Sequence, residues 1–120
     1  MATFTKLTLQ PAGTTGTGLG IKVAATATAG TAIHTASTTP ATIDEVWLYA
    51  VNSSTSSVKL TIEWGTATAA DGNIEVTVLP EAGLVTIIPG LILQNAKVVK
   101  AFAATADVIL LSGFVNAIVA

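Results

Sequence analysis

From residue 42 onward, apolar and polar positions alternate in short stretches, and this pattern predicts β-strands. In residues 58–64, Val58, Leu60 and Ile62 alternate with lysine, threonine and glutamate. A period of two points one set of side chains into a core and the other toward solvent, so we expect Glu63 on the solvent face. The other stretches bounded by turn residues are 42–52, 74–78, 84–88, 91–93, 96–103 and 107–119.

These stretches recur about every ten residues, which is typical of an antiparallel β-sandwich or jelly roll. No segment shows a sustained period of 3.6 residues with helix caps, so we expect little helix. We therefore predict an all-β fold in which residues 42–120 form a sandwich of about seven to eight strands. The last stretch, 107–119, is apolar on both faces. That pattern fits either a strand between two layers or a strand that faces a neighbouring subunit.

Residues 1–41 follow a different pattern, because threonine, alanine and glycine dominate them. Residues 3–9 alternate and predict a short strand, a glycine-rich stretch follows, and residues 21–28 suit a second extended segment. With so few large side chains this part cannot build its own core, and β-branched threonine favours extended backbone. We predict that residues 1–41 form an extended arm outside the domain.

The scarcity of charge changes the picture from a free-standing domain to a component of an assembly. Only 10% of the residues are charged and 51% are hydrophobic, whereas an ordinary soluble domain has about 25% charged residues. Five basic and seven acidic side chains cannot cover the surface of such a domain. We expect other protein copies to cover part of it.

Several classes of function are disfavoured by what the composition lacks. The chain has no cysteine, so disulfides, thiolate metal sites and cysteine nucleophiles are excluded, as suits a reducing cytoplasm. All five basic residues are lysines, and without arginine we expect no nucleic-acid partner. No apolar run approaches the roughly 20 residues of a spanning helix, and the first residues lack the apolar region of a secretory signal. We expect no membrane partner.

Candidate catalytic and metal-binding residues are few. His34 is the only histidine and has no acidic residue within nine positions on either side, so it is expected to be a surface or packing residue rather than part of a triad. One histidine without cysteine does not provide a zinc site. Glu63 and Glu75 lie on consecutive predicted strands, which fits a solvated face, with a cation site or a catalytic pair as alternatives. We predict no catalytic residue, no metal ligand and no cofactor.

Glycines and tryptophans need a structural interpretation as well. The run Gly16-Thr17-Gly18-Leu19-Gly20 resembles a phosphate loop only in its glycines, since neither a helix nor a Gly-Lys-Thr sequence follows. A flexible linker is the better interpretation. Trp47 and Trp64 are expected in the core by default, and one of them is a candidate for an interface, where aromatic residues are enriched.

Two stretches, Asp44–Asn52 and Leu60–Gly65, resemble small virion structural proteins of tailed bacteriophages, in particular capsid decoration (cement) proteins. Residues 84–90, 98–104 and 113–116 share this likeness, which extends over residues 43–119. The resemblance implies a non-enzymatic β-sandwich, often a homotrimer, that is made in the host cytoplasm and sits on the capsid surface. Its implied partners are the major capsid protein and further copies of itself.

Within this hypothesis, particular side chains are expected to mediate contacts. On the arm, the residues expected to dock on neighbouring subunits are Phe4, Leu7, Leu9 and Ile21. On the domain, the residues expected in subunit contacts are Trp47, Tyr49, Phe114 and Val115. The alternatives are a head–tail connector or tail component, a carbohydrate- or receptor-binding sandwich module and, as a third class, an enzyme that depends on His34.

Overall fold

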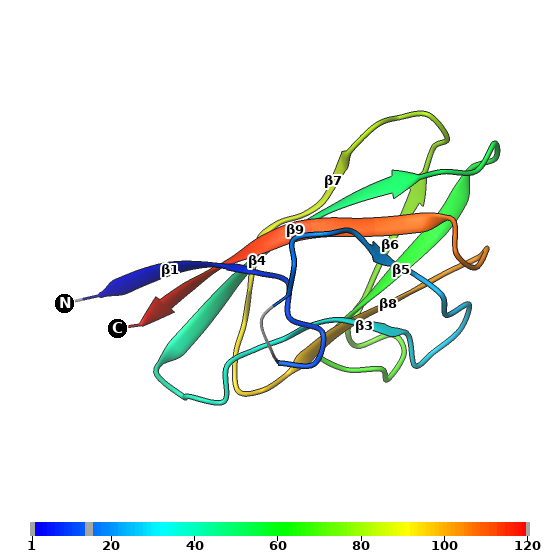
Figure 1. The fold of residues 1–120 in the computed structure, drawn as a ribbon. Coiled ribbons are helices and arrows are strands. Elements are labelled where there is room, and N and C mark those ends of the chain that lie inside the picture. The colour runs from blue at the N-terminus through cyan, green and yellow to red at the C-terminus, as the bar shows by residue number, and fades with distance from the viewer. Residues whose placement is uncertain (1, 14–15, 120) are drawn as a thin grey trace.

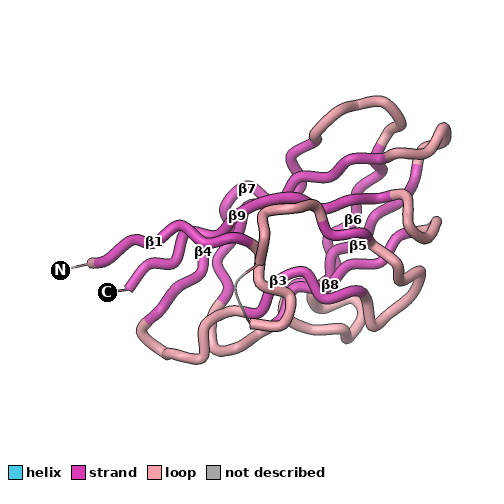
Figure 2. The backbone as a smooth tube through the Cα atoms, in the orientation of Figure 1, coloured by secondary structure: helices cyan, strands magenta, loops and turns pink. Residues whose placement is uncertain are grey.

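The computed structural model describes residues 2–13 and 16–119, and within them every regular element is a β-strand (Figure 2). Two antiparallel sheets pack face to face, so the prediction of an all-β sandwich is confirmed. The described strands number nine, of which six lie within residues 42–119, where about seven to eight were expected. They are β1 (Thr3–Thr8), β2 (Ile21–Lys22), β3 (Thr31–Thr35), β4 (Thr42–Asn52), β5 (Val58–Trp64), β6 (Asn73–Val78), β7 (Val85–Leu93), β8 (Val98–Ala103) and β9 (Ile109–Val119).

One sheet, here called the β9 sheet, has the order β1-β9-β4-β7, with β2 also paired to β9 (Figure 1). The other, the β5 sheet, has the order β3-β8-β5-β6. Aliphatic side chains from both inner faces fill the space between them, as in other sandwiches. The largest fully buried apolar residues are Val23, Ile33, Val46, Leu48, Leu60, Ile62, Val78, Val99, Ile109 and Leu111.

β4 shows most clearly how the sequence pattern builds the sheet. Burial alternates along all eleven of its residues, with Val46 and Leu48 pointing into the core and Trp47 and Tyr49 pointing out. β9 pairs with β4 along its whole length and with β1 and β2 on its other side. The apolar stretch 107–119 therefore forms a central strand, and its outward side chains remain only partly covered.

The segment expected to be a separate arm instead belongs to both sheets. β1 and β2 pair with β9, and β3 pairs with β8. Three large residues of this segment, Leu9, Val23 and Ile33, enter the common core. Small alanines and β-branched threonines suit such pairing because they pack closely in extended backbone. The change of composition near residue 41 is thus not a boundary between two folded parts.

β7 also differs from the prediction of two short strands, because Pro89 and Gly90 lie inside one strand. β7 is an edge strand, where a proline without an N–H group is tolerated. Its register against β4 shifts between Val46 and Trp47 and again between Leu48 and Tyr49. These register shifts accommodate Pro89 and Gly90, where the sequence predicted that one strand ends before the next begins.

The two ends of the described chain lie side by side at one end of the molecule (Figure 1). Thr3 pairs directly with Val119, and residues 3–6 are exposed. At this end β1 is the edge strand beside β9, so the β9 sheet offers a free strand edge along β1.

Candidate functional site

Three aromatic side chains gather on the outside of the β9 sheet. Trp47 and Phe114 are direct partners across β4 and β9, so their rings stack with centroids 5.9 Å apart and planes inclined by 12°. Tyr49 lies two residues along β4, and its ring is 6.5 Å from Phe114 at 29°. Cross-strand aromatic pairs of this kind stabilise a sheet. They also leave a large, rigid apolar surface toward solvent.

Polar groups at the edge of this cluster fix its geometry. The indole N–H of Trp47 donates to Glu45 Oε1 at 2.8 Å, and the amide N–H of Asn116 donates to the same oxygen at 3.1 Å. These two hydrogen bonds, the one from Trp47 first, hold the pKa of Glu45 below its ordinary value. The ammonium of Lys6 lies 4.5 Å from the centroid of the Phe114 ring, in a cation–π contact.

Gly90 of β7 makes room for the indole of Trp47. A Cβ atom at this position would lie 2.9 Å from Cζ2 of the indole, closer than a methyl group can approach. The backbone of Gly90 also has a φ of +86°, which favours glycine. The indole is thus held in a fixed orientation between Gly90 and Phe114, as expected of a residue that contacts a partner without rearranging.

Apolar side chains extend this surface toward the chain ends. Phe4 and Ile43 are both paired with Ile118, one from each side, so the three residues share the outward face. Ile92 of β7 lies opposite Glu45. Phe4 and Ile92 are 71% and 53% exposed. We call the whole surface the outer face; it consists of Phe4, Ile43, Trp47, Tyr49, Ile92, Phe114 and Ile118.

The structure brings together four of the eight residues expected at contacts and separates the others. Phe4, Trp47, Tyr49 and Phe114 lie on the outer face. The other four point the opposite way, because side chains alternate along a strand or because the chain turns inward. Leu9 and Val115 are buried in the protein's own core, and Leu7 and Ile21 pack partly against it. As folded, Leu9 and Val115 offer no surface to a partner.

His34 has a carboxylate partner that its sequence neighbourhood did not show. Its Nε2 lies 2.7 Å from Asp44 Oδ2, and both side chains are buried. The backbone N–H of Gln10 donates to Nδ1 at 3.1 Å, so the imidazole proton sits on Nε2 and is donated to Asp44. Neither ring nitrogen is free to take a proton from a hydroxyl nucleophile, as a triad histidine must. The alternation along β4 carried a signal for this contact. Asp44 is two and four residues from Val46 and Leu48, so all three side chains point to the inward face.

The prediction that Glu63 faces solvent is wrong. Its side chain is 1% exposed and accepts hydrogen bonds from Thr28 Oγ1 at 2.5 Å and from the Gly30 backbone N–H at 2.6 Å. The segment that contains Thr28 and Gly30 covers this side of β5, which the period-two pattern of β5 alone could not reveal. Glu75 pairs with Lys59 instead. Within residues 2–13 and 16–119, no group of three histidine, cysteine or acidic side chains is placed to hold a metal ion.

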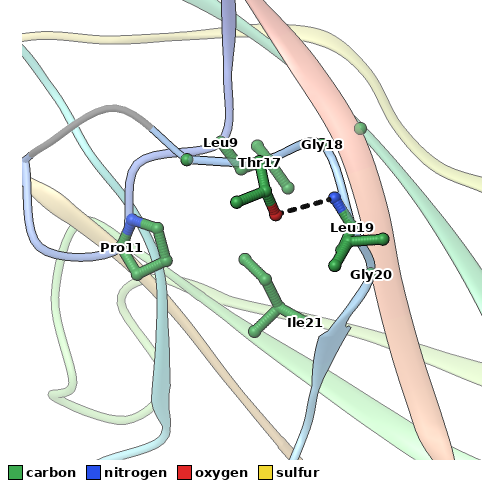
Figure 3. Close-up of a pocket in the computed structure, with 9 residues that line it drawn as sticks. Leu9, Pro11, Thr17, Gly18, Leu19, Gly20 and Ile21 are labelled. Carbon is green, nitrogen blue, oxygen red and sulfur yellow. Dashed lines mark hydrogen bonds between the residues drawn. The ribbon is translucent and has the colours of Figure 1, made fainter.

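The glycine-rich run lines a small cavity of about 220 Å³ beside β9 (Figure 3). Leu9, Pro11 and Ile21 form its apolar side, and Thr17 Oγ1 accepts a hydrogen bond from the Leu19 N–H at 3.4 Å. The run leads into β2 rather than into a helix, so it lacks the helix N-terminus of a phosphate loop. Its lining residues carry no charge.

Comparisons with family models, curated proteins and solved structures give no match to this chain. In the part of the chain that the structure describes, no helix is long and apolar enough to cross a membrane. The inference of function therefore starts from the outer face itself.

Proposed function

We propose that this chain is a structural virion protein that stabilises a bacteriophage capsid by binding across capsid subunits. The observation that carries the proposal is the outer face, where stacked aromatic rings and exposed aliphatic side chains lie together on a rigid sheet. The low charge of the chain supports it, because a surface covered by partners needs few ionic groups. Its partners would be the major capsid protein and further copies of the chain.

The energetics of such a contact favour this surface. Burying apolar area contributes about 25 cal/mol per Å², and a standard interface covers about 800 Å² of each partner. Aromatic residues dominate the binding energy of many interfaces. Because Trp47 and Phe114 are already held in place, they lose little conformational freedom on binding.

The free edge of β1 supports the same proposal in a second way. Edge strands present unpaired N–H and C=O groups that can pair with a strand of another chain. β1 is the last strand of its sheet, and its first residues are exposed. A neighbouring capsid subunit could therefore extend the β9 sheet beyond β1.

Co-sedimentation with capsid shells built from the major capsid protein of the phage that encodes the chain tests the proposal. The variant Phe4→Ser with Ile92→Ser removes two exposed side chains of the outer face, and we expect it to lose binding. The control, Leu79→Ser with Leu84→Ser, removes equally exposed leucines from the loop between β6 and β7. We expect the control to bind like the native chain. Equal binding by both variants, or no binding by the native chain, contradicts the proposal.

The same outer face would serve a head–tail connector or tail component. The number of copies per virion separates the two roles. A decoration protein covers the shell in many copies, whereas a connector occurs in a few copies at one vertex.

A carbohydrate-binding module is the second candidate, and one observation favours it. The aromatic ring of Trp47 lies beside the carboxylate of Glu45 and the amide of Asn116, and the ring of Tyr49 stacks on Phe114 in the same cluster. Sugars are bound by stacking on rings and hydrogen bonding to such groups. Glycan-array binding that is lost in Trp47→Ala would favour this function over a capsid contact. The buried Glu63 cannot take part in it.

A further inference from the structure

A second site lies at one end of the sandwich, apart from the outer face. It is a pocket of about 520 Å³ between the inner side of the β9 sheet and the segments 10–13 and 35–38. Leu7 and Ala117 contribute apolar walls, Ser37 and Thr42 contribute hydroxyl groups, and Asp44 contributes a carboxylate. This volume is within the range of small-molecule sites, about 300–1,000 Å³.

Asp44 is the residue that makes this pocket unusual. It is 2% exposed, its Oδ2 accepts the proton of His34 Nε2, and its Oδ1 has no hydrogen-bond partner among the residues that the structure describes. Nδ1 of His34 accepts from the Gln10 N–H, so both ring nitrogens are engaged and neither of them bonds to Oδ1. A buried acceptor without a partner is costly, and more so when it is charged.

The surroundings of Asp44 define which ligand would satisfy it. None of the residues that line the pocket is a lysine or an arginine, so the pocket lacks a cation of its own. A single carboxylate is too few for a calcium or magnesium site, which takes six or more oxygen ligands. An ammonium group brings a positive charge and three N–H donors. It can bond to Asp44 Oδ1 and to neighbouring hydroxyl oxygens at once.

We propose that this pocket binds a primary alkylammonium group, with Asp44 Oδ1 as the charged acceptor and Leu7 and Ala117 against the alkyl chain. A free amine and a lysine side chain of a partner protein share this chemistry. The site is separate from the outer face and does not depend on the function proposed for that surface.

Titration of the protein with n-butylammonium chloride, followed by amide chemical shifts and by calorimetry, tests the proposal. We expect saturable shifts at the amides of Gln10 and Thr38, with n-butanol and potassium chloride giving none. Asp44→Asn is the matched variant, since its amide oxygen can still accept from His34 while its NH₂ group replaces the free acceptor. We expect affinity to fall about tenfold or more, as for a lost charge-assisted hydrogen bond.

Two further variants serve as controls for the loss of binding in Asp44→Asn. Asp71→Asn changes an exposed carboxylate in a turn and should bind like the native protein. If Asp44→Asn does not fold, Ala12→Trp decides, because it places a ring at the rim of the pocket from an exposed position and should also abolish the shifts. Unchanged affinity in the folded variants, equal shifts with n-butanol, or no binding by the native protein would overturn the proposal.

A further arm of the experiment identifies the source of the amine. Nα-acetyl-lysine N-methylamide presents the same ammonium on a peptide backbone. Tighter binding than that of n-butylammonium supports a partner's lysine as the ligand. Weaker binding supports a free amine.

Discussion

At the residue scale, two glutamates of this chain have opposite surroundings and different roles. Glu63 is buried and ties the segment around Gly30 to β5 through short hydrogen bonds. Glu45 lies on the outer face and orients Trp47 and Asn116. One carboxylate therefore holds the fold together, and the other shapes the surface that we propose meets a partner.

We expect Glu63→Ala to lower the free energy of unfolding by about 1–3 kcal/mol, because the Gly30 N–H loses its acceptor. Urea denaturation measures this change. The control is Glu75→Ala, which removes only the partly exposed ion pair with Lys59 and should change stability by less than about 0.5 kcal/mol. Equal effects from the two variants would show that the buried hydrogen bonds add no stability.

Titration of the Glu45 carboxyl by NMR should show a pKa below the ordinary value of 4.5, because Trp47 and Asn116 donate hydrogen bonds to its ionised form. Since the folded-state pKa is the lower one, the stabilisation is fully present above pH 4.5 and is lost as the pH falls through the folded-state pKa. Trp47→Phe removes the largest cause. In that variant we expect the pKa to rise toward 4.5, and an unchanged pKa would contradict this assignment.

At the scale of elements, β1 and the residues after it are exposed at one end and buried at the other. The start of β1 carries Phe4 into solvent, whereas the chain just beyond β1 carries Leu9 into the core. β1 is therefore both an exposed edge and part of the sandwich. Truncation of the first twenty residues would remove a core residue together with the exposed end, so point variants separate the two better than a deletion does.

We expect Leu9→Ala to destabilise the fold by about 2–5 kcal/mol, as for other buried leucines. Phe4→Ala should change stability by less than about 0.5 kcal/mol, because its side chain is 71% exposed. Thermal or urea unfolding of the two variants measures both effects. Similar losses in both would mean that the start of β1 also packs against the core.

The sequence predicted best the strands in which buried and exposed residues alternate regularly. β4 and β5 have the bounds that alternation suggested. β3 was missed because its alanine and threonine residues show little contrast between faces, and its pairing with β8 joins residues far apart in the chain. The burial of Glu63 and the contact of His34 with Asp44 were missed for the same reason, since both depend on segments that only the tertiary fold brings together.

The candidate surface was predictable in part. Aromatic residues at alternating positions placed Trp47 and Tyr49 on one face of a strand. Their stacking with Phe114 depends on the register of β4 against β9, which the sequence alone does not fix. The same register turns Val115 into the core.

At the scale of the whole molecule, low charge and a large apolar outer face act together. Few ionic groups mean little electrostatic repulsion between copies, and exposed apolar side chains favour association. Through the outer face, the chain should therefore associate with itself as well as with a larger assembly.

Light scattering across a dilution series should give a mass above 12.0 kDa at high concentration that falls toward 12.0 kDa on dilution. Phe4→Asp introduces a charge into the outer face and should raise the midpoint concentration about tenfold or more. Leu84→Asp, in an equally solvent-accessible loop, should leave it unchanged. A constant mass of 12.0 kDa for the native chain at every concentration would contradict the expectation.

The strand order has a consequence for synthesis. Among the described strands, β1 and β2 pair only with β9, and β3 pairs only with β8. The first strands that the ribosome releases therefore wait for their partners until most of the chain has been translated. At about 5–20 residues per second, that wait lasts several seconds. A nascent segment rich in threonine, alanine and glycine exposes little apolar surface, so it can stay unpaired during this time without aggregating. A segment of larger aliphatic residues would be prone to aggregate.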